Sequence, residues 1–509
     1  MGRNGSKVIL TLAAILLIAS VAGAADRPPN VVFILADDLG FGDLGAYGQK
    51  KIRTPNIDRI GVEGMKFAAH YSGNAVCAPS RCVLMTGMHP GHAVVRDNVG
   101  MKNEAKGIPE GQFPILDETV TLAELMKKAG YVTGAFGKWG LGGPTSTGAP
   151  LRQGIDTFYG YNDQAVAHNF YPTYLWSNDE KVELRNPPFS AHQKLPAGVD
   201  PTKPESYAGY SGPDFSADLI AAQAVKFVHD NKDRPFFLFV PTTIPHLALQ
   251  VPDDALAEYR GAFEEEPYLG DRSYLPHATP RACYAAMVTR MDKHVGDLMQ
   301  AVEQLGLDDN TIFVFTSDNG PLYDRLGGTD TDFFESCRNL RGRKGSLYEG
   351  GIVAPLLVRW KGKIAPGNTS RRVTGFEDWL PTILALVGKP ELTPAGLDGI
   401  SFAPTLLGEG QEPRPFLYRE FRSYGGQQSV RIGDWKAVRQ NLRQVKNGAI
   451  STELYNLGTD PTESKDVAAS HPDVLARLEK VMAEQHAFSE DFRLPAVDPP
   501  AAPAAKKMP

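Results

Sequence analysis

Cysteine is scarce in this sequence. The 509 residues include four cysteines, Cys77, Cys82, Cys283 and Cys337. Small exported domains without a large hydrophobic core are held together by many disulfides, and so few cysteines exclude a scaffold of that kind. Because 42% of the residues are hydrophobic, the chain has the material for one large core and a smaller domain.

Strong net charge and long apolar runs are also missing. The formal charge is -6, which gives no reason to expect nucleic acid or an anionic membrane as a partner. An apolar run at 8–19 is too short to span a membrane. It follows Arg3 and Lys7 and precedes small residues at 22–24, as in a secretory signal peptide. We therefore expect residues 1–24 to direct export to the periplasm or outside the cell, with no stable membrane anchor.

Short apolar runs alternate with helical patterns over residues 25–398. Polar residues follow each run at once, as expected of strands buried on both faces. This alternation predicts an α/β fold, a large domain with a mostly parallel central sheet flanked by helices. The expected strands are 31–35, 131–136, 236–240 and 311–316, and the expected helices are 121–128, 217–228 and 281–305.

A smaller α+β domain is predicted over residues 399–490. Asp398 and Gly399 open a connection after a last helical pattern of the large domain at 376–388. Short strand-like runs follow at 415–420, 429–432, 435–439 and 453–457, and a helical pattern follows at 472–486. The Pro- and Ala-rich residues 491–509 are predicted to form a disordered tail.

Polar side chains stand at the ends of the expected strands. They are Asp37 and Asp38, Lys138, His246, and Asp318 and Asn319. Because ligands of open parallel sheets bind beyond the carboxyl ends of the strands, these side chains are expected to meet at one edge. A single Asp or Asn there would be a turn or a helix cap. Two pairs at two strand ends favour a metal site, and their oxygen donors select calcium, or less favourably magnesium, over zinc.

The stretch 72–87, S-G-N-A-V-C-A-P-S-R-C-V-L-M-T-G, carries the most specific motif. Cys77 stands two residues before Pro79 and four before Arg81. A lone cysteine is by default a small buried hydrophobic residue, but the arginine and the polar neighbours do not fit a core helix. The stretch resembles the C-x-P-S-R signature of the sulfatases, the formylglycine-dependent, arylsulfatase-like family of the alkaline phosphatase-like superfamily. The resemblance covers the chain from 29 to about 486.

The resemblance implies a catalytic domain over 25–398 and a small C-terminal antiparallel sheet with a helix. It implies that a formylglycine-generating or sulfatase-maturing enzyme oxidises Cys77 during export, and that the hydrated aldehyde is the nucleophile. The catalytic residues carried over by motif are Cys77, Arg81, Lys138, His246 and Lys344. The calcium ligands carried over are Asp37, Asp38, Asp318, Asn319 and the modified Cys77.

The chain departs from the sulfatase pattern at one catalytic position. The common G-K-W-H-L-G motif reads G-K-W-G-L-G here, so Gly140 replaces a histidine that contacts the formylglycine hydrate. His168, His89 or His92 could supply an imidazole from another loop. Arg96 and Asn98 lie in a segment that resembles one near the sugar-binding side of sulfatases.

The substrate contacts are expected from three residues, Arg96, Asn98 and His168. His168 lies in the aromatic-rich stretch 165–176, which would suit stacking on a sugar ring. A hydrophobic loop packed on the domain is an equally good interpretation of that stretch.

Three functions fit these features. The leading one is an exported sulfatase that hydrolyses sulfate esters, above all of sulfated carbohydrates. A phosphate or phosphonate ester hydrolase on the same fold would keep the metal and the cations. A pseudoenzyme that binds sulfated glycans would fit Gly140, although the intact C-A-P-S-R stretch argues against it.

Overall fold

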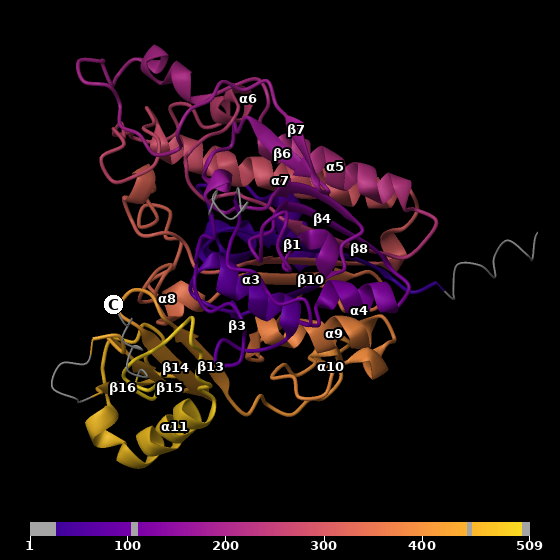
Figure 1. Cartoon of the computed structure of the whole chain (residues 1–509), viewed down its shortest axis with the longest axis vertical. Helices are drawn as coiled ribbons and strands as arrows, with labels where there is room; N and C mark the ends of the chain where they lie inside the picture. Colours follow the sequence, from indigo (N-terminus) through magenta and orange to yellow (C-terminus); the bar gives the residue numbers. More distant parts are fainter. Residues whose placement is uncertain (1–26, 103–109, 445–449, 501–509) are drawn as a thin grey trace, which may run out of the picture.

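A ten-stranded sheet forms the centre of the molecule in a computed structural model that describes residues 27–102, 110–444 and 450–500 (Figure 1). The predicted signal peptide, residues 1–24, lies outside the described residues. The strands run in the order β11 (Asn368–Ser370), β2 (Met65–Phe67), β10 (Leu356–Trp360), β9 (Thr311–Ser317), β1 (Asn30–Ala36), β8 (Phe236–Pro241), β4 (Val132–Lys138), β5 (Thr157–Tyr161), β6 (Tyr174–Ser177) and β7 (Glu180–Glu183). The central strands β9, β1, β8, β4 and β5 are parallel, and antiparallel pairs lie toward both edges. A short parallel pair is formed by β12 (Thr374–Gly375) and β3 (His70–Tyr71).

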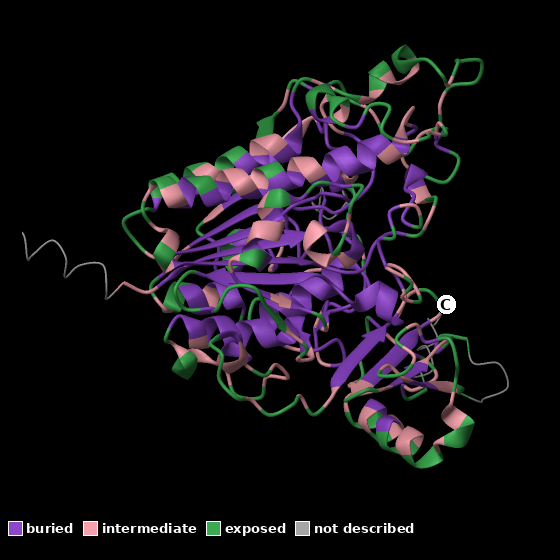
Figure 2. Cartoon of the chain, turned by 180° about the vertical axis from the view of Figure 1, so that it is seen from behind, coloured by how far each residue is buried: buried purple, intermediate pink, exposed green. Residues whose placement is uncertain are grey.

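The four predicted strands are β1, β4, β8 and β9. Every residue of β1, β8 and β9 is buried, which explains their unbroken apolar sequences. Figure 2 shows this burial through the centre of the molecule. The predicted α/β fold with a mostly parallel sheet is confirmed.

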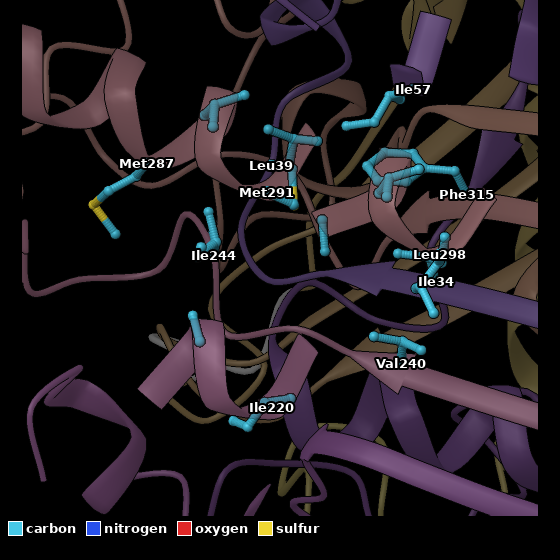
Figure 3. Close-up of a cluster of buried hydrophobic side chains, with 14 of the residues drawn as sticks. Ile34, Leu39, Ile57, Ile220, Val240, Ile244, Met287, Met291, Leu298 and Phe315 are labelled. Atoms are coloured by element: carbon cyan, nitrogen blue, oxygen red, sulfur yellow. The ribbon is translucent and has the colours of Figure 1, made fainter. Parts of the chain in front are cut away.

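Helices cover both faces of the sheet, because successive side chains of a strand point to opposite faces. Ile34 of β1 packs on the same side as Val240, Ile220 and Leu298 (Figure 3). Its neighbour Phe33 belongs to the cluster on the opposite face. The first face carries α2 (Pro55–Val62), α5 (Ser216–Asp230), α6 (Asp253–Ala257) and α7 (Pro280–Gln304). The second carries α3 (Cys77–Thr86), α4 (Leu122–Lys128), α9 (Trp379–Leu386) and α10 (Ala403–Leu406).

A separate antiparallel sheet lies in the C-terminal part, as the resemblance implied. Its strands are β13 (Leu417–Phe421), β14 (Gln427–Ile432), β15 (Trp435–Arg439) and β16 (Thr452–Asn456). Leu478 and Met482 of α11 (Pro472–Glu484) pack on Tyr418 and Val430 of this sheet. The predicted boundary at 399 stays a prediction, because α10 still packs with the large core.

The prediction that a disordered tail begins at 491 is wrong for its first residues. Phe492 and Leu494 are 2% and 1% exposed. The N–H of Ala496 donates to the carbonyl of Leu442 at 3.0 Å. Composition alone does not show that two apolar side chains within a Pro- and Ala-rich stretch are buried against the domain. Residues 501–509 lie outside the described part.

All four cysteines are buried and unpaired. Over the described ranges, no helix combines the length and the apolarity needed to cross a bilayer.

Candidate active site

The carboxyl ends of the central strands bring the predicted polar residues together around α3. Ligand atoms of Asp37, Asp38, Cys77 and His246 all lie within 4.8 Å of one another. Asp37 and Asp38 follow β1, and His246 follows β8. Each of the four residues is at most 3% exposed. The predicted residues therefore converge in a buried, highly charged site.

Cys77 lies in the middle of this site, at the first residue of α3. Its Sγ is 3.3 Å from Oδ1 of Asp37, and 3.5 Å from Nζ of both Lys138 and Lys344. The helix starts here because Val76 is extended, and the N-terminus of a helix favours negative charge. Burial, and then the charge of Asp37, raise the pKa of the thiol to about 12. An unmodified Cys77 would thus stay protonated at neutral pH and be a poor nucleophile.

Three cations face three carboxylates beside Cys77. Lys138 Nζ lies 2.6 Å from Asp37, and Lys344 Nζ lies 2.8 Å from Asp38. Arg81 donates through Nε and Nη2 to Oδ2 of Asp318 at 3.1 and 2.9 Å. The formal charges of these six groups cancel, which compensates for the cost of burying them.

The oxygen donors of this cluster fit a calcium ion. Asn319 donates from Nδ2 to Asp38 at 2.7 Å, but its buried Oδ1 has no hydrogen-bond partner among the described residues. An unpaired buried amide oxygen beside three carboxylates is a donor set for a hard cation.

The carboxylates of this set differ in the direction in which their pKa values are shifted. Burial raises the pKa of Asp318 to about 6, helped by Asp37 and opposed by Arg81. Burial acts in the same direction on Asp37, but the charges of Lys138 and Arg81 hold its pKa well below the ordinary value.

His246 is fixed with its Nε2 toward the carboxylates. Its Nδ1 donates to the carbonyl of Leu247 at 2.7 Å, and Nε2 lies 3.5 Å from Asp38. Burial and the charges of Lys344 and Lys138 lower the pKa of this imidazole well below its usual value. His246 is therefore neutral when no anion is bound to the two lysines.

Similarity to known proteins decides the family. The family model Sulfatase matches residues 29–389, and the model for the C-terminal part of N-sulphoglucosamine sulphohydrolase matches 343–487. Human arylsulfatase A is 34% identical over 500 residues, which cover 92% of this chain and 89% of that protein. The chain belongs to the sulfatase family. It is a sulfuric ester hydrolase.

Two further relatives agree with this assignment. The N-acetylgalactosamine-6-O-sulfatase of Bacteroides thetaiotaomicron is 29% identical over 513 residues, covering 90% of this chain and 93% of that protein. The crystal structure of Ps i-CgsB in complex with k-i-k-neocarrahexaose aligns with a TM-score of 0.71 and 25% identity, covering 92% of this chain and 94% of that chain.

Three histidines were candidates to replace the imidazole that is missing at Gly140, and of these His168 lies at the site. His168 stacks on His246, with ring centroids 4.9 Å apart and an interplanar angle of 11°. Burial lowers the pKa of His168, and the charges of Lys138 and Lys344 act in the same direction. His89 and His92 stack on each other instead, and His92 pairs with Asp398 at 2.9 Å.

The two other predicted substrate residues have different environments. Asn98 is exposed, and its Oδ1 accepts from the N–H of Ala78 at 2.9 Å, directly beside Cys77. Arg96 is 5% exposed and pairs with Glu420 of β13 at 2.8 Å. The substrate contact of Arg96 stays a prediction, and its guanidinium joins the large domain to the C-terminal sheet. The sequence did not reveal this, since the partner lies 324 residues away.

Sequence reasoning missed several groups at the site. Tyr274 lies 5.3 Å from the ring of His168, and Nε2 of His192 lies 3.0 Å from its Nδ1. Gln164 lies against Gly140. These residues come from loops without a motif, so no local signal marked them.

Proposed function

We propose that this sulfatase is exported and hydrolyses sulfate esters of carbohydrates, with a formylglycine made from Cys77 and a bound calcium ion. The observation that carries the proposal is the environment of Cys77, whose Sγ lies within 3.5 Å of Lys138, Lys344 and Asp37 at a helix N-terminus. The high pKa of the unmodified thiol argues against a thiolate mechanism.

The proposed calcium ion would be held by Asp37, Asp38, Asp318 and Asn319, with the modified Cys77 beside it. Calcium would neutralise charge on a sulfate oxygen, and the hydrated aldehyde would supply the attacking oxygen.

The side chains of the chain itself would bind the ester and move the proton. Lys138 and Lys344 lie on either side of position 77 and would stabilise charge on the sulfate oxygens. His246 would donate a proton from Nε2 to the leaving alcohol oxygen. A bound anionic sulfate would offset the two lysine charges that now depress the pKa of His246, so the substrate would itself favour the protonated acid.

A carbohydrate substrate is supported by the similar proteins. One is named for a sulfated N-acetylgalactosamine, and one was solved with an oligosaccharide. Within the site, His168 and Asn98 are the residues that we propose to contact the sugar. The sulfatase match favours sulfate over the phosphate or phosphonate esters considered above.

The test is to produce the full chain with a maturing enzyme and to determine the state of residue 77. Carbonyl labelling and loss of thiol reactivity in the tryptic peptide 67–81 should show the aldehyde. The matured protein should hydrolyse 4-nitrophenyl sulfate much faster than 4-nitrophenyl phosphate. Cys77→Ser should be inactive, whereas the matched Cys82→Ser, also buried in α3, should keep turnover. Turnover by protein that carries an unmodified Cys77 would refute the proposal.

Export has its own test. The protein from a cell that secretes it should begin near residue 25 and be found outside the cytoplasm. An intact N-terminus in the cytoplasmic fraction would contradict export.

A further inference from the structure

A loop after β5 lies beside the end of β4 that carries Lys138. It comprises Asn162, Asp163 and Gln164. Tyr161, the last residue of β5, pairs in register with Lys138, and the N–H of Trp139 donates to the carbonyl of Tyr161 at 2.9 Å. The loop therefore leaves the sheet directly next to the lysine that contacts Cys77.

Gln164 occupies the space that a side chain at position 140 would need. Gly140 has a φ of +79°, and a Cβ built on it would lie 2.5 Å from Nε2 of Gln164. The missing imidazole is thus replaced by an amide from a different loop.

Three polar atoms of the two loop amides are buried without a hydrogen-bond partner among the described residues. Asn162 is 1% exposed, and neither its Nδ2 nor its Oδ1 is paired. Gln164 is 5% exposed, and its Nε2 is unpaired. Buried polar groups are nearly always satisfied by protein, water or a ligand. Two such amides in one loop point to a bound polar molecule.

The residue between the two amides anchors the loop. Asp163 accepts from the N–H of Gly111 at 2.9 Å and from the N–H of Ala165 at 2.6 Å. The backbone is therefore held in place while the two amides remain free to bind.

We propose that this loop recognises the substrate through both amides, an inference that rests on the proposed sulfate ester hydrolysis. Gln164 donates from Nε2 to a sulfate oxygen, which can only accept. Asn162 has an unpaired donor and an unpaired acceptor, and a hydroxyl group satisfies both. Its ligand is therefore a hydroxyl of the alcohol portion next to the sulfate, as a sugar provides and an aryl sulfate does not.

The experiment compares two substrates and one inhibitor. The substrates are 4-nitrophenyl sulfate and the best substrate from a panel of monosulfated hexoses and hexosamines, and the inhibitor is inorganic sulfate. Asn162→Leu should lower kcat/KM for the sugar at least tenfold and leave the aryl sulfate within threefold. Gln164→Met should lower kcat/KM for both substrates at least tenfold and raise the Ki of inorganic sulfate. Asn162→Leu should leave that Ki unchanged.

A matched control separates recognition from folding. Gln153 is also buried with an unpaired Oε1, but its Nε2 donates to the carbonyls of Leu116 and Thr147 at 3.3 and 2.9 Å. Gln153→Met should lower the midpoint of thermal unfolding and keep both kcat/KM values. The two loop variants should keep the midpoint, because their amides have no partner to lose. If Asn162→Leu does not fold, Asn162→Ala provides the same ratio of the two substrates.

Three results would overturn the inference. The first is unchanged kinetics in both loop variants, which is expected if ordered water alone satisfies the amides. The second is an equal loss of kcat/KM on both substrates in Asn162→Leu. The third is an unsubstituted enzyme that hydrolyses the aryl sulfate but no sugar of the panel. Failure of the proposed function looks different, because the matured unsubstituted enzyme would then hydrolyse neither kind of sulfate.

Discussion

Restoring the histidine of the sulfatase motif by Gly140→His should destabilise this protein. At a φ of +79° an L-residue costs about 1–2 kcal/mol relative to glycine. The imidazole would also have to displace the buried side chain of Gln164, whose Nε2 lies 2.5 Å from a built Cβ, and overpacking by a whole ring costs about 1–3 kcal/mol. The free energy of unfolding should therefore fall by about 2–5 kcal/mol.

Removing the neighbour should recover the steric part of this loss. In Gly140→His with Gln164→Ala, about 1–2 kcal/mol from the backbone should remain. A double-mutant cycle by urea unfolding should then give a coupling of about 1–3 kcal/mol between the two positions. The control is Gly130→His, since Gly130 has a φ of +88° and nothing within 4 Å of a built Cβ. This variant should lose only the backbone part.

The refuting result is additivity. If the two substitutions at 140 and 164 add within about 0.5 kcal/mol, Gln164 does not occupy the place of the imidazole. The same conclusion follows if Gly130→His loses as much as Gly140→His.

Three further predictions concern catalysis, pH and metal. His246→Gln should lower kcat/KM for a sugar sulfate by a factor of about 10²–10⁴. The loss for 4-nitrophenyl sulfate should be much smaller, because its leaving group needs no proton. Equal losses on both substrates in steady-state assays would argue against a role of His246 as the acid. His70 is fully buried, and burial lowers its pKa to about 3. The unfolded state therefore binds a proton at a higher pH than the folded state does. The contribution of the neutral imidazole to the free energy of unfolding is intact above about pH 6.5 and is lost as the pH falls toward 3. Relative to His70→Gln, urea unfolding of the unsubstituted protein should therefore lose about 2 kcal/mol more between pH 7.5 and 5, and parallel pH curves would contradict the neutral buried imidazole. Removal of calcium by a chelator should abolish turnover, and added Ca²⁺ should restore it. The protein should stay folded by circular dichroism, because Lys138, Lys344 and Arg81 already neutralise the carboxylates. Activity that persists in the chelator would exclude an essential calcium.

The central strands and the charged residues at their ends could be predicted from short stretches of sequence. The strand 31–35 is an unbroken apolar run because β1 is buried on both faces, and this property is written in consecutive residues. Asp37, Lys138, His246 and Asp318 follow such runs directly, so the parallel topology alone predicts that they meet.

The strands at the two edges of the large sheet were harder to predict. The exposed β7 has no buried face, and β11 is a short edge strand. Neither carries a hydrophobic period that would mark it as a strand. Their pairing depends on the neighbouring strand rather than on their own residues.

By itself the sequence determined the large α/β domain, the small C-terminal sheet, the sulfatase motif around Cys77 and the set of charged residues at the strand ends. Each of these rests on residues close together in the chain. Only the tertiary structure decided that Arg96 pairs with Glu420, that His168 stacks on His246 and that Gln164 fills the space beside Gly140. Those contacts join different loops or domains, and their partners are selected by packing of the whole chain, which no local pattern encodes.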